Sequence, residues 1–457
     1  MPIESPNEPP RPGRLIIPGA EPESDAPGPQ APRIVLPPGV AREIPDDVPE
    51  YPRLRPLILL PVRDGERDFI LVSDPLGVIR GQPVLGIDAL PILQLLDGTV
   101  SLTDLSAALM RESKDLRVSH ALKEMIADLD RLLMLESPRF ERAYQELRDA
   151  YHPLEIRRAA LEGRSYPAER EELERTLDQH FAEAAAVRDA AGEPVAATDA
   201  RPRALLAPHL DPRRAGGAIA RAFLELGDQP ARPLRVVIFG TGHSLLGDRF
   251  ALTRKHFQTP LGKALCDTAF VDAVATPLDD AAYHAELAHR EEHSIEFAVL
   301  YLQRRLGARP FTIVPILVGG FHALLDEGRT PREDLGYEAL IGAVRDAEKT
   351  QGGDTLYVAA VDLSHVGPRF GDPRLDDEAK QEIEKVDRAA IEAARAGDAD
   401  AWFRVIAEQD DATRICGFAP AYVTLRCAEP GAGRLLRYEQ SDEPDTSLVS
   451  VAALAWP

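Results

Sequence analysis

The sequence predicts an α/β fold in which one sheet is covered by helices on both faces, preceded by a small domain of strands and helices. The first observation is a set of unbroken apolar runs of strand length at residues 204–207, 234–240, 311–318 and 355–361. Helical patterns separate these runs, and strands that are apolar on both sides are typical of sheets buried on both faces. The second observation is a separate cluster of short strands and helices at residues 53–138.

Length and composition limit the function classes. A chain of 457 residues predicts two or three domains, and its formal net charge of -22 argues against binding to nucleic acid or to an anionic membrane. Three cysteines cannot form a disulfide framework, so we expect a cytoplasmic protein. The N-terminus has no signal-peptide pattern, and no run of about 18 apolar residues indicates a membrane span.

Residues 1–52 form a proline-rich, polar leader that we expect to be disordered. Proline removes backbone donors and blocks helices, and this segment has too few large apolar residues to build a core. Two short apolar islands, at residues 15–17 and 34–36, are compatible with docking on a partner, but a solvated linker is the simpler interpretation.

The next domain, residues 53–138, is predicted as two strands followed by three helices. The strands are residues 57–62 and 69–72, joined by a turn at residues 63–67. The helices are residues 86–96, a second that starts from a cap at Ser101 or Thr103 and ends near residue 111, and residues 119–133.

This order of elements, with Leu-Gln-Leu-Leu-Asp-Gly-Thr at residues 93–99 and Ser-Leu-Thr-Asp-Leu at residues 101–105, resembles the PqqD-like winged-helix modules. The resemblance implies recognition of a peptide or a partner protein. Two alternatives stay open: a structural appendage that only packs on the main domain, and a DNA-binding regulator. The acidic net charge disfavours the regulator.

Residues 139–200 are predicted as a helical lead-in to the α/β domain. One helix spans residues 140–151, a second starts near residues 167–169 and continues through residue 181, and a loop follows at residues 189–201. Beyond it, further helices are expected at residues 216–226, 294–306, 333–348 and 376–396, with closing strands at 435–438 and 448–453.

Metal-ligand residue types are spread along the second half of the chain, each where a strand is expected to end. They are His209, His243, His293, His365 and Cys416. In an open α/β sheet, functional groups gather at the carboxyl ends of the strands. Three or more of these side chains meeting there would form a metal site with an open position, which is typical of a catalyst. The other two cysteines, Cys266 and Cys427, are expected in the core.

Five short motifs stand in a fixed order around these residues. They are Ala-Pro-His at 207–209, Gly-Thr-Gly-His-Ser at 240–244, Glu-His-Ser-Ile-Glu at 292–296, Asp-Leu-Ser-His-Val-Gly at 362–367 and Cys-Gly at 416–417. With an opening segment at residues 157–167, this series resembles the Memo family, whose bacterial members include the AmmeMemoRadiSam system protein B. The Memo-like domain is accordingly placed at residues 139–457.

The resemblance implies a fold similar to that of the class III extradiol dioxygenases and a mononuclear metal site. By that resemblance, His209, His243 and Cys416 are the metal ligands, with the cysteine where the dioxygenases have a carboxylate. Two imidazoles and a thiolate suit iron, copper or zinc better than magnesium or calcium. For redox chemistry, iron or copper is expected before zinc.

The resemblance also implies residues that handle protons. His365 takes the place of the acid/base histidine of the dioxygenases, with Asp362 to orient it, and His293 lines the same cleft. Glu292 and Glu296 are expected to accept hydrogen bonds from the imidazoles and to fix their tautomers.

The chain departs from the family pattern beside two of the proposed ligands. After His209 the family has aromatic residues, whereas this sequence has Leu-Asp-Pro-Arg-Arg at residues 210–214, and Thr241-Gly242 replaces Pro-Ser. Arg213 and Arg214, next to a Gly-Gly pair, could hold a carboxylate or phosphate group of a substrate. The alternative is a solvated arginine pair.

The sequence lacks a dinucleotide-binding fingerprint, a P-loop and a Gly-x-Ser-x-Gly nucleophile elbow. We therefore expect a metal-dependent redox enzyme, oxygenase-like, with an N-terminal recognition module for a peptide or partner. The alternative is a non-catalytic binding scaffold or metal carrier that works with a radical-SAM partner. Binding of the metal and consumption of oxygen by the purified protein discriminate the two.

Overall fold

The computed structural model describes residues 48–64, 67–115, 117–227 and 233–457. Almost all of the predicted disordered leader, residues 1–52, and part of the predicted turn at 63–67 lie outside the described residues. The chain divides into two compact units. The N-terminal unit holds residues 59–72, residues 83–135 and the described residues up to Leu54, and the second unit holds residues 55–58, 73–82 and 136–457.

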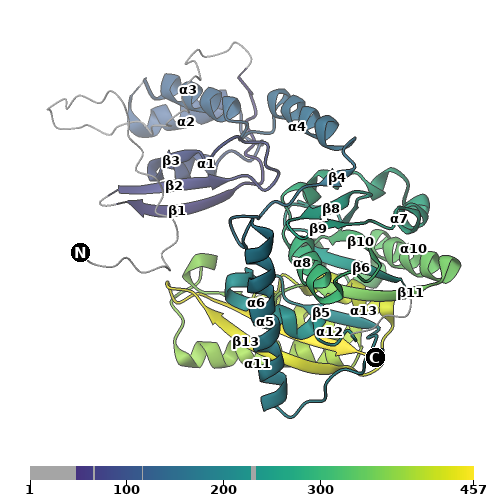
Figure 1. Ribbon diagram of the computed structural model, residues 1–457. Coiled ribbons are helices and arrows are strands. Elements are labelled where there is room, and N and C mark those ends of the chain that lie inside the picture. The colour runs from purple at the N-terminus through teal and green to yellow at the C-terminus, as the bar shows by residue number, and fades with distance from the viewer. Residues whose placement is uncertain (1–47, 65–66, 116, 228–232) are drawn as a thin grey trace. The chain divides into compact units, whose positions relative to one another are not determined.

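The N-terminal unit is a three-stranded sheet followed by helices (Figure 1). Its sheet has the order β1 (Ile58–Asp64), β2 (Arg67–Ser73), β3 (Val84–Gly86). A 3-10 helix (Ile87–Ala89), α1 (Leu90–Leu93), α2 (Leu102–Ser113) and α3 (Arg117–Arg131) follow. Ser101 caps α2, because its hydroxyl accepts a hydrogen bond from the Asp104 backbone N–H at 3.0 Å.

The first helix of this unit differs from its prediction. Of the helix expected at residues 86–96, residues 87–93 are helical, as a 3-10 turn followed by α1, while Gly86 ends strand β3. The residues of β3 pair with β2, with Leu85 opposite Ile70, and both side chains are buried. The helix is therefore shorter than predicted at both ends. The winged-helix assignment of this unit remains a prediction.

The second unit is built on an eight-stranded sheet (Figure 1). Its strands are β5 (Ala204–Ala207), β6 (Leu234–Thr241), β7 (Phe250–Leu252), β10 (Phe311–Val318), β11 (Asp354–Ala360), β12 (His365–Val366), β13 (Arg434–Asp442) and β14 (Leu448–Trp456). The order is β12-β14-β5-β11-β6-β10-β7, and β13 pairs with β14. The four central strands β5, β11, β6 and β10 are parallel, while β14 and β7 flank them antiparallel. A second sheet consists of β4 (Ile156–Arg157), β8 (His256–Thr259) and β9 (Gly262–Ala264).

Helices cover both faces of the large sheet. The helices of the second unit are α4 (Pro138–Tyr151), α5 (Arg170–Ala190), α6 (Pro212–Phe223), α7 (Thr268–Ala275), α8 (Ser294–Leu306), α9 (His322–Asp326), α10 (Leu335–Gln351), α11 (Asp377–Arg395), α12 (Ala399–Ala407) and α13 (Phe418–Ala428), of which α4 contributes to neither core of the sheet. Single 3-10 turns lie at Thr276–Ala282, Glu286–Arg290, Pro331–Glu333 and Pro368–Phe370. Among the described residues, no helix combines the length and the apolar character that crossing a membrane requires.

Alternate residues of each strand enter two separate cores. In β6, Val237 and Phe239 join the core formed with α7, α10, α11, α12 and α13, whereas Val236 and Ile238 join the core formed with α5, α6 and α8. This division follows from the two-residue period of a strand, in which successive side chains point to opposite faces. The structure thus confirms the predicted α/β class, with a sheet between two helical layers.

Two helices near the functional residues depart from their predictions. The helix expected at residues 216–226 begins at Pro212, because Asp211 caps it by accepting a hydrogen bond from the Arg213 N–H at 2.9 Å. Helix α13 was not predicted, because it is apolar nearly throughout and has Pro420 in its first turn. Proline is tolerated there since the first N–H groups of a helix have no partner within the helix.

Candidate metal centre

The parallel strands bring the predicted ligands to one edge of the sheet. His209 follows β5, His243 follows β6 and Asp362 follows β11, so all three lie at the carboxyl ends of neighbouring parallel strands. Two helix starts complete the edge: Cys416 lies two residues before α13, and His293 lies directly before α8. Residues separated by up to 207 positions in the sequence therefore meet in one place.

Three of these side chains form a compact group of possible metal ligands. One ligand atom each from His209, His243 and Cys416 lies within 4.8 Å of the others. The Cys416 Sγ is 3.5 Å from the His209 Nε2, and the two imidazole rings are 5.3 Å apart and nearly perpendicular. His209 is buried, while 40% of the His243 side chain is exposed. The group is therefore closed to solvent at His209 and open to it at His243, as a site with an open coordination position requires.

Two neighbouring groups meet the same distance limit. They are His243 with Glu292 and His293, and Asp362 with His365 and Cys416. Because His243 and Cys416 each belong to two groups, all the residues form one continuous cluster. The His293 ring stacks on that of His243, with centroids 4.9 Å apart and planes 14° apart.

Backbone carbonyls fix two of the imidazoles. The Nδ1 of His209 is 2.8 Å from the Ala360 carbonyl oxygen, and the Nδ1 of His365 is 2.9 Å from the Leu363 carbonyl oxygen. A carbonyl oxygen only accepts, so each Nδ1 carries the hydrogen. The Nε2 of each ring is left with its lone pair, which is the form in which imidazole binds a metal or accepts a proton.

Glu292, two residues before α8 begins, holds the other two imidazoles. Its carboxylate is 3.1 Å from the His243 Nδ1 and 3.2 Å from the His293 Nδ1. It also accepts hydrogen bonds from the backbone N–H groups of His243, His293 and Ser294, at 2.8–3.1 Å. Burial raises the pKa of Glu292, but the charge and hydrogen bond of His243 outweigh it and hold this pKa well below its usual value.

The expected role of Glu296 is corrected by the structure. Its carboxylate accepts hydrogen bonds from the Arg157 guanidinium, from the Tyr166 hydroxyl and from the backbone N–H groups of Ala160 and Leu161. None of its partners among the described residues is an imidazole. The reason is that one further turn of α8 points the side chain at residues 157–166. Glu296 acts indirectly, because Arg157 also donates to the Glu292 carbonyl oxygen at 2.6 Å.

Asp362 also differs from its expected role as the group that orients His365. Its Oδ1 accepts hydrogen bonds from the backbone N–H groups of His209 at 2.9 Å and Leu210 at 3.0 Å, and its Oδ2 is 3.7 Å from the His209 Nε2. The His365 Nδ1 uses the Leu363 carbonyl instead. Asp362 therefore positions the backbone that carries His209, and burial raises the pKa of its carboxyl group.

The electrostatic setting favours neutral imidazoles at His209 and His365 and a protonated Cys416 thiol until a cation is bound. Burial, with the neighbouring His293 and His243, holds the pKa of His209 well below its usual value. Burial also lowers the pKa of His365, although Asp362 opposes this, and raises the pKa of the Cys416 thiol well above its usual value. A metal ion would reverse the effect on Cys416, since a coordinating thiol is deprotonated by the cation. For His243, the Glu292 carboxylate outweighs desolvation and raises the pKa.

The cluster opens into a pocket of about 640 Å³. A second cavity of about 550 Å³ lies on the other side of His243 and Cys416 and continues past Phe321 and Tyr337. His322 lines both spaces. Sequence reasoning missed this histidine, although it follows β10 at the same edge of the sheet and the strand-end rule could have found it.

Asp411 is a second residue that the sequence did not indicate. Its carboxylate lines the pocket, accepts a hydrogen bond from the Ile415 N–H at 2.8 Å and lies 3.7 Å from the His322 Nε2. Burial raises its pKa to about 6. The backbone at Asp411 has a φ of 46°, which non-glycine residues rarely adopt. Such strain is common near functional sites, and here it places a carboxyl group in the loop that leads to Cys416.

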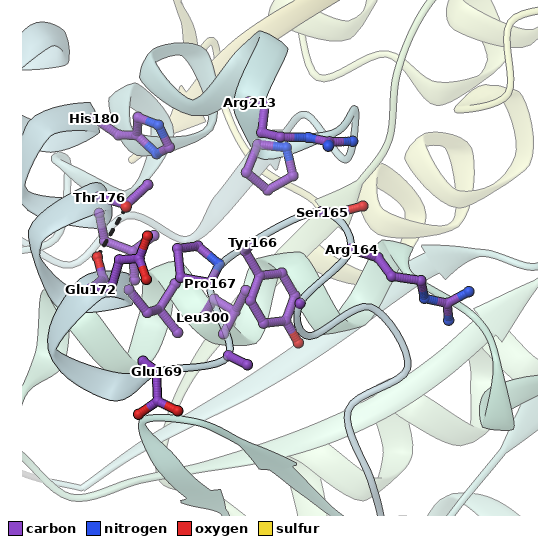
Figure 2. A pocket seen from close by; sticks show the side chains of 15 residues that line it. Arg164, Ser165, Tyr166, Pro167, Glu169, Glu172, Thr176, His180, Arg213 and Leu300 are labelled. Atoms are coloured by element: carbon purple, nitrogen blue, oxygen red, sulfur yellow. Dashed lines mark hydrogen bonds between the residues drawn. The ribbon is translucent and has the colours of Figure 1, made fainter. Parts of the chain in front are cut away.

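The two adjacent arginines face different cavities. Arg214 lines the pocket of the metal centre and contacts Glu443. Arg213 pairs with Asp211 at 2.7 Å and lines a separate cavity of about 520 Å³, where Figure 2 shows it opposite Glu169 of the α5 start. Of the two arginines expected to hold a substrate group, only Arg214 therefore lines the pocket of the metal centre, because successive residues of a helix project in different directions.

Parallel strands ending in imidazoles and a thiol define an α/β protein with a potential transition-metal site. Residues 157–455 match the family model of Memo-like proteins. A MEMO1 family protein of Aquifex aeolicus is 26% identical over 395 residues, which is 85% of this chain and 96% of that protein. Another, of Thermus thermophilus, is 32% identical over 253 residues, which is 55% of this chain and 71% of that protein. The chain belongs to the family of Memo-like proteins.

The relatives also bear on the N-terminal unit. A MEMO1 family protein of Methanopyrus kandleri is 28% identical over 297 residues, which is 63% of this chain. The Aquifex alignment covers more of the chain than residues 136–457 contain, so it must extend into the N-terminal unit. That unit is therefore not peculiar to this chain.

Proposed function

We propose that this protein is a metal-dependent redox enzyme with a single transition metal held by His209, His243 and Cys416. The observation that carries the proposal is the meeting of three ligand atoms within 4.8 Å of one another. Such a donor set, with the His209 Nε2 unprotonated and the His243 Nδ1 beside a carboxylate, matches what a metal site needs. A bound metal supplies redox chemistry and an open position for an oxygen-containing ligand.

The chemistry of the donors narrows the choice of metal. Imidazole nitrogens and a thiolate favour transition metals over magnesium or calcium, which prefer oxygen ligands. Of these, we propose iron or copper before zinc, because zinc has no redox chemistry of its own. The role of Glu292 is to keep the Nδ1 of His243 and of His293 engaged, so that both rings keep a fixed orientation.

His365 is the proposed acid/base group. Its Nδ1–H donates to the Leu363 carbonyl, so its Nε2 can accept a proton from a substrate in the pocket. Burial keeps the ring neutral by lowering its pKa, and the nearby Asp362 carboxyl group would stabilise the imidazolium once it forms. His293 lines the same pocket beside Phe297 and confines the substrate there.

Metal analysis of anaerobically purified protein tests the proposal. We expect close to one iron or copper per chain in the wild type, and its loss in both His209→Ala and Cys416→Ala. The matched control is Cys266→Ala, which removes a core thiol whose sulfur donates to the Thr253 carbonyl and belongs to none of the candidate ligand groups, so the metal should be kept. A wild type that holds no metal after reconstitution would contradict the proposal.

The second candidate function is a binding scaffold or metal carrier that works with a radical-SAM partner through the N-terminal unit. The edge strand β1 favours a recognition role for that unit, because its side chains at Ile58, Leu60 and Val62 are 49%, 39% and 36% exposed and share one face. Under this alternative the protein holds metal but consumes no oxygen. Replacing the three side chains with serine should then abolish association with the partner and leave the metal content unchanged.

A further inference from the structure

Three arginines line the pocket of the candidate metal centre, and each is close in sequence to a residue of that centre. They are Arg214, five residues after His209; Arg369, four residues after His365; and Arg414, two residues before Cys416. Such short connections keep the guanidinium groups near the cluster. The pocket therefore places positive charge next to the position where a substrate would meet the metal.

Two of these arginines share one carboxylate. Arg214 and Arg369 both donate to the Oε1 of Glu443, the latter at 3.0 Å. Arg214 is further held by the Ser441 hydroxyl and carbonyl oxygens at 3.0–3.1 Å. The Arg369 side chain is 61% exposed and uses only one nitrogen of its guanidinium for Glu443. The trio of Arg214, Arg369 and Glu443, called the rim cluster below, thus carries one positive charge in excess.

The remaining charged groups of the pocket do not neutralise this excess. Arg414 is occupied by Asp372 and by the His365 carbonyl oxygen. The Asp211 carboxylate pairs with Arg213 and with the backbone at the start of α6. Asp411 faces His322 and accepts the Ile415 N–H, and Asp362 accepts the N–H groups of His209 and Leu210. None of these three carboxyl groups is a partner of the rim cluster among the described contacts.

We propose that the rim cluster is the docking site for an oxyanion group of the substrate. The inference rests on the proposed function, since it concerns the same pocket. Arginine binds planar carboxylates and phosphates through two parallel N–H groups, and Arg369 has nitrogens free for this in the described structure. Apolar walls next to the cluster, formed by Leu210, Phe370 and Val449, match an apolar body on the substrate.

Glu443 has a defined part in this proposal. It stands where an incoming anion would bind and acts as an internal competitor for the two guanidinium groups. Its side chain is only 13% exposed, so it is held in place between them. Removing its charge while keeping its size, as Glu443→Gln does, should strengthen the binding of an external anion. A purely structural clamp would respond in the opposite way or not at all.

Calorimetric titration of the full-length protein tests the proposal with three probes: benzoate, its neutral isostere benzamide, and inorganic phosphate. We expect an anion to bind at least tenfold more tightly than benzamide, with an affinity that falls as salt concentration rises. Preference for benzoate identifies a carboxylate substrate, and preference for phosphate identifies a phosphate ester. Equal binding of benzamide and the anions, or no binding of either anion, overturns the proposal.

Variants locate the binding site. Arg369→Gln should weaken anion binding at least tenfold, and Glu443→Gln should strengthen it several-fold. Arg213→Gln is the matched control, because this arginine adjoins Arg214 in sequence but lines the other cavity, and it should leave the affinity unchanged. An effect of Arg213→Gln equal to that of Arg369→Gln, or weaker binding by Glu443→Gln in a protein with unchanged thermal unfolding, overturns the proposal.

The titration separates this inference from the proposed function. It is run on both chelator-treated and metal-reconstituted protein, and the metal content of each sample is measured. If the protein takes up no metal on reconstitution but still binds the anion, the result supports the rim cluster as an anion site and contradicts the proposed redox function. If the protein is fully loaded with metal but binds no anion, the proposed metal site stands and the proposal of an oxyanion site at the rim cluster is overturned.

Discussion

Two neighbouring cavities of the second unit have similar volumes but different internal organisation. The cavity beside α5 encloses about 520 Å³, and the pocket of the metal centre about 640 Å³. The first is lined by hydrogen-bonding groups such as Thr176, whose hydroxyl donates to the carbonyl four residues earlier (Figure 2), and His180, which bonds to the Tyr301 hydroxyl. No group of possible metal ligands lies among its described residues. In the second, His209, His243 and Cys416 each bring a ligand atom within 4.8 Å of the others.

This difference shows that the convergence of ligand atoms, and not the volume, distinguishes the candidate site. Hydrogen bonds between distant segments occur in both cavities, as the contact of His180 with Tyr301 shows. A group of three metal-ligand side chains is different, because the whole fold must hold all three in one place. The predictions below test the contrast by pairing a variant at one cavity with a variant at the other.

The largest effect is expected at Arg157, beneath the histidine cluster. Its side chain is 1% exposed and donates to Glu296, to the Glu292 carbonyl and to the His289 carbonyl. Arg157→Met leaves the Glu296 carboxylate buried without its counter-charge and should cost about 3–5 kcal/mol of unfolding free energy. The exposed Arg164 of the α5 cavity is the control, and Arg164→Met should change stability by less than about 0.5 kcal/mol in urea denaturation. Equal losses of unfolding free energy in the two variants would show that the two cavities do not differ in this respect.

The next effect is the pH dependence that Asp411 confers. Its pKa is about 6 in the folded protein against 3.8 as the ordinary value, so the folded state holds this proton more tightly than the unfolded state does. The stabilisation is therefore complete below pH 3.8 and is lost as pH rises through 6, with a total of about 3 kcal/mol. Asp411→Asn cannot titrate.

Urea denaturation of both proteins at pH 4 and pH 7 provides the measurement for Asp411. The unfolding free energy of the wild type, taken relative to Asp411→Asn, should be lower at pH 7 than at pH 4. A relative stability that instead increases with pH would mean that folding lowers the pKa of this carboxyl group.

A smaller effect is expected for the carboxylate that holds the imidazoles. Glu292→Gln removes the charge that faces the Nδ1 of His243 and of His293, and groups that orient metal ligands typically contribute 10–100-fold to affinity. We expect a loss of that size in competition titrations with a chelator. Glu172→Gln, at the mouth of the α5 cavity, should leave the affinity unchanged. If Glu292→Gln binds the metal as tightly as the wild type does, this carboxylate has no part in holding the metal ligands.

The sequence predicted the features that depend on local periodicity. The strands β5, β6, β10 and β11 were predicted correctly, because a strand that is buried on both faces is an unbroken apolar run. Such a run can be recognised from the local sequence alone. The strand-end rule then singled out His209 and His243, which the sheet brings together. Family membership, shown by the match over residues 157–455, agrees with the resemblance seen in the ordered motifs.

Features that depend on the orientation of a helix against a distant segment were not predictable. Glu292 and Glu296 lie four residues apart, yet only Glu292 faces the imidazoles, since Glu296 accepts hydrogen bonds from donors 130–136 residues away. Arg213 and Arg214 diverge because α6 begins at Pro212, four residues before the predicted start. Asp411 carries no periodic signal, because it lies in a turn with left-handed backbone angles.

The smallest effect is expected at His180 in the α5 cavity. Its Nδ1 is 2.8 Å from the Tyr301 hydroxyl, and the two rings stack with centroids 6.0 Å apart. Burial lowers the pKa of His180, so the neutral ring accepts this hydrogen bond. His180→Phe keeps a ring of similar shape but removes the acceptor, and losing one hydrogen bond should cost about 1 kcal/mol.

Metal content is the decisive measurement for His180→Phe. The two cavities share Ser165 in their walls, and the His180 ring packs on Gly216 of α6, the helix that follows His209. A coupling between the cavities would therefore act through α6. We expect unfolding in urea to shift slightly while the metal content stays that of the wild type. Loss of metal in this variant would show that the α5 cavity supports the cluster. The packing of His180 on α6 would then help to set the position of His209.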